Sequence, residues 1–271
     1  MQQSFSSTVM VGPSPRIAVE HAGAGEPVLF LHGIGGNRWN WVRAMSALAP
    51  SHFVMAWDAR GYGDSDDYSG VLTDFDFVTD IARVLDHFEI DKCHIVGLSM
   101  GVLNAIDFYD EHPERVKSLV LSGGSTEDYQ AAQQDRAAYL KARLEPFLGG
   151  LDPSDLAEDM LASLLAPASD KTVVQEATQS LLALRKDSYI KSMRCYAATS
   201  GRSHKFAKVT VPTLGIVGEH DLLTPPERMA EVMALIPGAD LKIINAAGHL
   251  PNIERPEEFN RVLLGFLDTV V

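Results

Sequence analysis

Short apolar segments bounded by turn-forming residues recur along the chain and alternate with longer segments of helical spacing. The strand-like segments are residues 28–31, 53–57, 94–96, 119–121, 214–217 and 242–244. The helix-like segments include residues 41–48, 74–88, 100–112, 226–235 and 256–267. Because this alternation places helices against the faces of a sheet, it predicts an α/β protein with a mostly parallel central sheet.

A different pattern occupies residues 126–205, where strand-like runs vanish and Ala, Leu, Gln and charged residues dominate. This pattern predicts a helical insertion. We expect residues 1–125 and 206–271 to form one core domain, and the inserted segment to form a cap over the functional site of that domain. A chain of 271 residues is long enough for one large core and such a smaller lobe. The alternative is a set of surface helices with no role at the site.

Composition narrows the possible partners. Hydrophobic residues make up 46% and charged residues 22%, as in ordinary soluble domains. The net charge of -13 disfavours nucleic acid as a partner. Cys93 and Cys195 form neither a disulfide framework nor a metal motif. No apolar run approaches the roughly 18 residues needed to span a membrane, and residues 1–11 lack the features of a signal peptide. We therefore expect a cytoplasmic protein; the sequence is compatible with a homo-oligomer.

A Gly-x-Ser-x-Gly motif lies between a strand-like and a helix-like segment, at Gly97, Ser99 and Gly101. A sharp strand-to-helix turn strains its central residue and needs small neighbours two positions away, which the glycines provide. The hydroxyl of Ser99 would then project above the sheet at a helix N-terminus, which favours developing negative charge. The motif predicts Ser99 as a nucleophile; the alternative is a glycine-rich turn that happens to contain a serine.

A glycine-rich loop, residues 32–36, follows the first predicted core strand. Ligands bind at such carboxyl ends of strands. We expect the backbone amides of Ile34 and Met100 to form an oxyanion hole, and His32 to organise the loop rather than act in catalysis.

Two further strand ends carry an acid and a base. Asp221 follows one predicted strand and His249 follows the next, which gives the chain order Ser, Asp, His typical of this architecture. His249 would take the proton of Ser99, and Asp221 would hold the imidazole. Glu127 and Asp128, after the preceding core strand, are the alternative acids.

Five motifs in this order resemble the α/β-hydrolase fold superfamily over nearly the whole chain. They begin at His32, Asp58, Gly97, Gly218 and Gly248. Residues 237–239 and 248–256 are similar to the C-terminal part of 3-oxoadipate enol-lactonases and related carboxylesterases. The resemblance implies a serine hydrolase that cleaves a small-molecule ester or lactone, with no metal or cofactor, and a structural role for the turn at Asp58. Meta-cleavage C-C hydrolases are also similar, but they usually have Asn where this chain has Leu98. A hydrolase-like ligand receptor with slow turnover is the other alternative.

The cap would select the substrate through residues that face the site. Its apolar candidates are Leu144, Phe147, Leu148, Leu161, Leu164 and Leu165, and its cations are Arg143, Arg185, Lys186, Arg194 and Arg202. A substrate carboxylate would pair with one of these cations. Our candidate substrate-binding residues are Gly33, Trp39 and Arg194; Trp39 and Trp41 either line the pocket or pack beneath it.

Overall fold

An eight-stranded sheet forms the centre of the described protein. The computed structural model describes residues 6–126, 133–198 and 201–270. The strands, in chain order, are β1 (Ser7–Val11), β2 (Ile17–Ala22), β3 (Glu26–Leu31), β4 (His52–Trp57), β5 (Cys93–Leu98), β6 (Val116–Ser122), β7 (Thr213–Gly218) and β8 (Asp240–Ile244). Their order across the sheet is β1-β2-β4-β3-β5-β6-β7-β8.

The pairing of the strands confirms the predicted fold class. All pairs from β4 to β8 are parallel, whereas β1 pairs with β2, and β2 with β4, in antiparallel fashion. The six predicted strands correspond to β3–β8. The sequence analysis did not predict β1 and β2, because polar residues interrupt their apolar patterns. β1 is an edge strand with an exposed start, and β2 contains Glu20 and His21.

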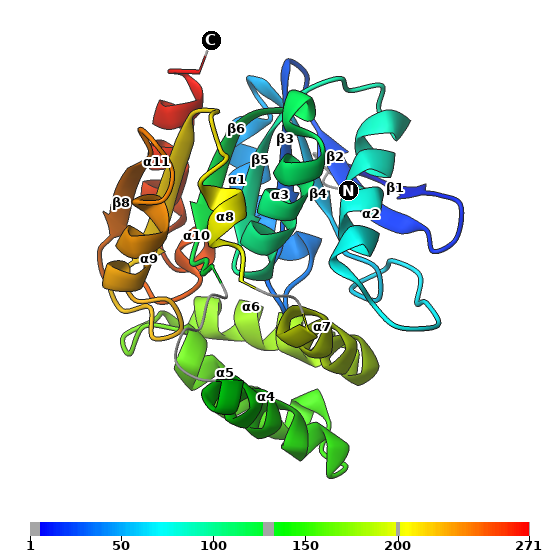
Figure 1. Cartoon of the computed structure of the whole chain (residues 1–271). Coiled ribbons are helices and arrows are strands. Elements are labelled where there is room, and N and C mark those ends of the chain that lie inside the picture. Colours follow the sequence, from blue (N-terminus) through cyan, green and yellow to red (C-terminus); the bar gives the residue numbers. More distant parts are fainter. Residues whose placement is uncertain (1–5, 127–132, 199–200, 271) are drawn as a thin grey trace.

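Helices cover both faces of the sheet (Figure 1). The bounds are α1 (Val42–Leu48), α2 (Asp74–His87), α3 (Met100–Glu111), α4 (Gln133–Leu148), α5 (Pro153–Leu164), α6 (Lys171–Leu182), α7 (Lys186–Ala198), α8 (Ser203–Phe206), α9 (Pro226–Met233), α10 (Pro251–Glu254) and α11 (Pro256–Leu267), with 3-10 helices η1 (Arg38–Trp41) and η2 (Pro113–Arg115). Helices α1 and α11 pack against one face, and α2, α3 and α9 against the other.

Successive side chains of a strand lie on opposite faces of the sheet, so one strand contributes to both layers of the core. In β3, Val28 and Phe30 join the cluster beneath α1 and α11, whereas Leu29 and Leu31 join the cluster beneath α2 and α3. All four side chains are fully buried. Successive strand residues point to opposite faces, so a strand covered on both sides must be apolar throughout.

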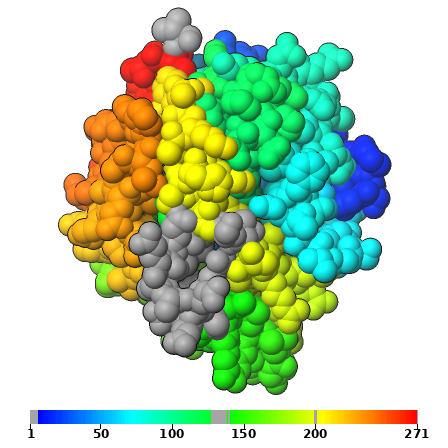
Figure 2. All heavy atoms as spheres, viewed as in Figure 1, coloured from blue at the N-terminus to red at the C-terminus, as the bar shows by residue number. Residues whose placement is uncertain are grey.

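The segment predicted to form a cap contains α4, α5, α6, α7 and the beginning of α8. These helices stand between β6 and β7 in the sequence, and α4–α7 form a lobe at one end of the sheet (Figures 1 and 2). In this lobe α4 packs on α7 and α5 on α6. The positions at which core and cap are divided stay a prediction.

Buried polar contacts fasten this lobe to the core. Tyr196 Oη donates a hydrogen bond to Asn104 Oδ1 of α3 at 2.8 Å. Beyond α7, the fully buried guanidinium of Arg202 pairs with Asp107 of α3, with Nη2 and Oδ2 2.9 Å apart. Because both contacts reach α3, they link the insertion to the helix that begins at the Gly-x-Ser-x-Gly motif.

A helix that crosses a bilayer must be both long and apolar. Within residues 6–126, 133–198 and 201–270, none of the helices meets both requirements.

Candidate active site

Ser99 occupies a strained turn between β5 and α3. Its backbone angles are φ 53° and ψ -111°, a conformation that a non-glycine residue adopts at a cost of about 1–3 kcal/mol. The flanking glycines are required by close approach of the backbone. A Cβ on Gly97 would lie 2.3 Å from the carbonyl oxygen of Gly101, and a Cβ on Gly101 would lie 2.2 Å from that of Leu31. The motif therefore packs the start of α3 directly on β5 and β3, which leaves Ser99 at the tip of the turn.

Asp221 and His249 form a buried hydrogen-bonded pair. Nδ1 of His249 donates to Oδ2 of Asp221 at 2.8 Å, and both side chains are nearly inaccessible to solvent. The other carboxylate oxygen accepts from the backbone amides of Leu223 and Thr224 at 2.9 and 2.8 Å. These bonds fix the orientation of the carboxylate, and the carboxylate in turn fixes the imidazole.

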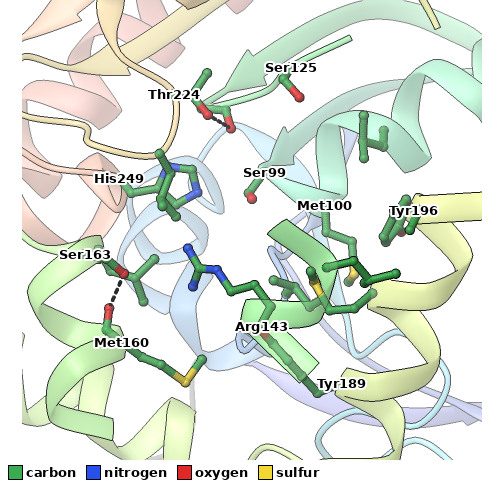
Figure 3. Close-up of a pocket in the computed structure, with 18 residues that line it drawn as sticks. Ser99, Met100, Ser125, Arg143, Met160, Ser163, Tyr189, Tyr196, Thr224 and His249 are labelled. Atoms are coloured by element: carbon green, nitrogen blue, oxygen red, sulfur yellow. Dashed lines mark hydrogen bonds between the residues drawn. The ribbon is translucent and has the colours of Figure 1, made fainter. Parts of the chain in front are cut away.

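Ser99 and His249 line one cavity of about 140 Å³ (Figure 3). The described residues around it are Ile34, Ser99, Met100, Leu103, Gly123, Ser125, Leu140, Arg143, Met160, Ser163, Leu164, Tyr189, Met193, Tyr196, Ala197, Leu223, Thr224 and His249. Nε2 of His249 is buried and makes no hydrogen bond with any residue that the structure describes. The imidazole thus has one nitrogen engaged by Asp221 and the other available on the side of the cavity.

The glycine-rich loop adjoins the serine. A Cβ on Gly33 would lie 3.1 Å from Cβ of Ser99, so the loop passes directly over this side chain. Ile34 and Met100 both line the cavity. The amide of Met100 is the first of helix α3 and has no partner within the helix, because the first amides of a helix never do. The structure therefore brings Gly33, Ile34 and Met100 to the serine, as their predicted roles require.

His32 organises this loop from below. Its Nε2 accepts a hydrogen bond from the amide of Ala59 at 3.0 Å, so its Nδ1, 2.8 Å from the carbonyl oxygen of Gly33, is the donor. Burial lowers the pKa of His32, which agrees with a neutral ring. His32 does not line the cavity, and it lies where the predicted organising role requires.

Two predicted substrate-binding residues lie away from the cavity. Trp39 is 49% exposed and stacks beneath the guanidinium of Arg38. Arg194 is exposed on α7, whose cavity face presents Tyr189, Met193, Tyr196 and Ala197 instead. Arg194 follows Met193 by one position, and this step of about 100° turns it away from the cavity. Neither residue is among the described residues that line this cavity, and their role in binding substrate stays a prediction.

The sequence analysis left open the position of Trp41, the identity of the acid and the choice among the cap cations. Trp41 is fully buried and packs between Phe30 and Phe259, so it lies beneath the site rather than in it. Glu127 and Asp128, the alternative acids, lie outside the described residues. Of the five cap cations, Arg143 alone lines the cavity among the residues described.

Sequence reasoning missed two residues that hold His249 in place. Gly123, directly after β6, has φ +59°, and a Cβ there would lie 2.9 Å from Cε1 of His249. Glu254 is buried in α10; its Oε1 accepts from the amides of Gly248 and Leu250, and its Oε2 from the amide of Ala166 and the hydroxyl of Ser169. A carboxylate five residues after a histidine, at the end of a four-residue helix, is the only signal that the sequence offers for Glu254.

A protein-bound metal ion is usually held by several His, Cys, Asp or Glu side chains that lie close together. Within residues 6–126, 133–198 and 201–270, no three His, Cys, Asp or Glu side chains are grouped so as to hold a metal ion.

The chain is similar to known proteins in both sequence and structure. The model of the alpha/beta hydrolase fold family matches residues 26–256. A 2-hydroxy-6-oxononadienedioate/2-hydroxy-6-oxononatrienedioate hydrolase from Burkholderia vietnamiensis is 29% identical, over 97% of this chain and 94% of its own length. A thermophilic esterase from Thermogutta terrifontis, solved with malate bound, superposes with a TM-score of 0.87 at 26% identity, covering 98% of this chain and 99% of its own. The enol-lactonase of Burkholderia xenovorans LB400 has the same fold, with a TM-score of 0.79 at 23% identity, covering 93% of this chain and 97% of its own.

Proposed function

Since the chain belongs to the alpha/beta hydrolase fold family, we propose that it hydrolyses a small carboxylic ester or lactone through an acyl-enzyme on Ser99. The observation that carries the proposal is the Asp221–His249 pair beside a cavity that Ser99 enters from the turn between β5 and α3. A buried, oriented imidazole with one free nitrogen next to a serine is the arrangement that activates a hydroxyl.

The proposed reaction has two halves. Oγ of Ser99 attacks the carbonyl carbon while Nε2 of His249 takes its proton, and Asp221 stabilises the imidazolium. The amides of Ile34 and Met100 bind the oxyanion of the tetrahedral intermediate. When the carbon–oxygen bond breaks, His249 returns the proton to the leaving alkoxide. Water then attacks the acyl-enzyme in the same way, which releases the acid and restores Ser99.

Covalent labelling tests the nucleophile. A fluorophosphonate probe followed by peptide mass mapping should mark Ser99, and it should mark no residue in Ser99→Ala. A tag on another residue, or none on the wild type, contradicts the proposal. Turnover of an activated short-chain ester should fall by about 10⁴-fold or more in Ser99→Ala and in His249→Ala.

A matched pair of variants tests the acid. Asp221→Asn should remove most turnover, because the neutral amide neither holds the required tautomer nor stabilises the imidazolium. Glu127→Gln should leave turnover largely intact. If the second variant is as damaging as the first, Asp221 is not the acid.

Cleavage of a carbon–carbon bond is the second candidate. It is favoured by the hydrolase from Burkholderia vietnamiensis, whose name specifies 2-hydroxy-6-oxononadienedioate as its substrate. The two candidates separate in one assay, in which the purified protein is given this dienedioate and, in parallel, an ester and lactone panel read by a pH indicator. Rapid loss of the dienedioate with little ester turnover would favour the second candidate.

A further inference from the structure

The turn that follows β6 lies against all three residues of the proposed triad. The carbonyl oxygen of Ser122 accepts a hydrogen bond from the amide of Ser99 at 2.8 Å. The next residue, Gly123, adjoins the other two, since a Cβ added to it would lie 2.9 Å from Cε1 of His249 and 3.3 Å from Oδ2 of Asp221. A movement of this turn would therefore change the space in which the imidazole and the carboxylate meet.

Gly123 has no side chain, so backbone hydrogen bonds fix its orientation. Its amide donates to the carbonyl oxygen of Ile216 at 3.2 Å. Its own carbonyl oxygen accepts from the hydroxyl of Thr224 at 3.1 Å, a bond that Figure 3 shows as a dashed line beside His249. Glycine has more conformational freedom than any other residue. The bond from Thr224 therefore restrains a peptide group that the chain itself leaves free to rotate.

Thr224 also binds the proposed acid. Its amide donates to Oδ1 of Asp221 at 2.8 Å, while its hydroxyl donates to Gly123. The side chain of threonine is branched at Cβ and has few χ1 rotamers, so the hydroxyl and the amide keep a fixed relation. Thr224 is only 5% exposed, which leaves water little access to replace the bond to Gly123. One residue thus fixes the carboxylate and the turn relative to each other.

We propose that Thr224 is a positioning residue for His249. Its hydroxyl holds the carbonyl group of Gly123, and Gly123 in turn limits the movement of the imidazole that Asp221 orients. This inference rests on the function proposed above, in which Nε2 of His249 takes the proton of Ser99. Thr224 transfers no proton in this role. Without its hydroxyl the turn can rotate, and the imidazole gains space that Gly123 now occupies.

Two substitutions of Thr224 separate the hydroxyl from the shape of the side chain. Thr224→Val replaces the hydroxyl by a methyl group and keeps the branched shape, whereas Thr224→Ser keeps the hydroxyl. With an activated short-chain ester, kcat should fall by about 10- to 100-fold in Thr224→Val, because a shift of about 1 Å at a catalytic group has an effect of this size. KM should change little, and Thr224→Ser should recover most of the wild-type kcat.

Thr213→Val is the matched control. Thr213 begins β7, at the opposite end of this strand from Asp221; it is 4% exposed and its hydroxyl donates to the carbonyl oxygen of Val211 at 2.9 Å. This variant loses the same kind of buried hydrogen bond, so its Tm should change about as much as that of Thr224→Val, but its kcat should not change.

Three results would each overturn the proposal: an unchanged kcat in Thr224→Val, an equal fall in Thr213→Val, or no recovery in Thr224→Ser. If Thr224→Val does not fold, Thr224→Ala, which also lacks the hydroxyl, takes its place.

A measurement without turnover separates this proposal from the hydrolytic one. The Nδ1 proton of His249 lies in the buried hydrogen bond to Asp221, and NMR of protein labelled with 15N-histidine follows its exchange with water. Exchange should be about 10-fold faster or more in Thr224→Val, since the turn then opens more often, and unchanged in Thr213→Val. Faster exchange in Thr224→Val together with absent ester turnover by the wild type would retain the positioning role and refute the hydrolase. Ester turnover by the wild type with unchanged exchange in Thr224→Val would do the reverse.

Discussion

Glu254 accepts a hydrogen bond from the backbone amide of Gly248 at 2.9 Å, one residue before His249. Its second carboxylate oxygen accepts from the amide of Ala166 at 2.8 Å, in the loop that follows α5. The amide of His249 itself donates to the carbonyl oxygen of Leu164 at 2.7 Å. One buried carboxylate thus joins the loop of the candidate base to the lobe that covers it.

Glu254→Gln should therefore impair both stability and turnover. The amide has one acceptor oxygen, so at least one pair of donors loses its partner, and the expected loss is about 2–3 kcal/mol in the free energy of unfolding. Urea denaturation measures this loss, and kcat should fall more than KM rises because the imidazole is less well held. Glu257→Gln, at an exposed position of α11, is the control and should change neither quantity.

Gly123→Ala should displace His249. The new Cβ would lie 2.9 Å from Cε1 of the imidazole and 3.3 Å from Oδ2 of Asp221, so the ring must move. A shift of about 1 Å at a catalytic group lowers the rate by about 100-fold, and this fall should appear in kcat/KM for an activated ester.

Gly238→Ala is the matched control for this variant. Gly238 also has positive φ, at +74°, but nothing lies within 4 Å of its added Cβ. Both variants pay a similar backbone cost of about 1–2 kcal/mol, so only Gly123→Ala should lose activity out of proportion to stability. Equal activity in the two variants would contradict the steric explanation.

Asp107→Asn should strongly destabilise the fold. Arg202 is fully buried and Asp107 is 2% exposed, so the substitution leaves a buried guanidinium without its carboxylate. Loss of one partner of such a pair costs about 3–5 kcal/mol, measurable by thermal or urea unfolding. Asp86→Asn removes the exposed partner of Arg115 and should cost no more than about 1 kcal/mol. If both variants lost a similar amount of unfolding free energy, the burial of an ion pair would not determine how much its loss destabilises the fold.

His94 should make the protein acid-sensitive well above the range in which carboxylates titrate. Burial is the main cause that lowers its pKa to about 4, while it shares a 2.7 Å hydrogen bond with Ser118. In the unfolded chain the pKa of histidine is about 6.5, so protons bind the unfolded state preferentially between these values. The free energy of unfolding should therefore fall as pH drops below 6.5, by about 2 kcal/mol at pH 5, and level off below pH 4.

Denaturant titrations at pH 7.5 and pH 5 measure this dependence. His94→Gln should show a smaller loss between these two values than the wild type, whereas His220→Gln, at an exposed position, should retain the full loss. An unchanged pH dependence in His94→Gln would assign the acid sensitivity to other groups.

The candidate residues on the sheet could be read from the sequence because parallel strands end at a common edge. Ser99 follows β5, Asp221 follows β7 and His249 follows β8; β5 and β7 are largely apolar and buried, and the more exposed β8 ends in two isoleucines. Once the strands are identified, their carboxyl ends must converge. No long-range information is needed beyond the pattern itself.

Side chains outside the sheet could not be placed in this way. Trp39 and Trp41 are two positions apart in a 3-10 helix, and the turn of this helix exposes one and buries the other. Arg143 faces the cavity and Arg194 does not, because the rotation of α4 and α7 is set by their mutual packing. Both helices have weak amphipathic patterns, so the sequence does not say which face turns inward.

Strands β6 and β7 are hydrogen-bonded neighbours, although the whole helical lobe separates them along the chain. Two of the bonds that tie this lobe to the histidine loop and Glu254 end on the carbonyl oxygen of Leu164 and the amide of Ala166, groups that any non-proline residue supplies, and a third comes from the hydroxyl of Ser169. Most side-chain substitutions in the lobe would therefore leave these two backbone hydrogen bonds unchanged. An exchange of helix faces in the lobe would therefore leave these two backbone bonds to the histidine loop in place.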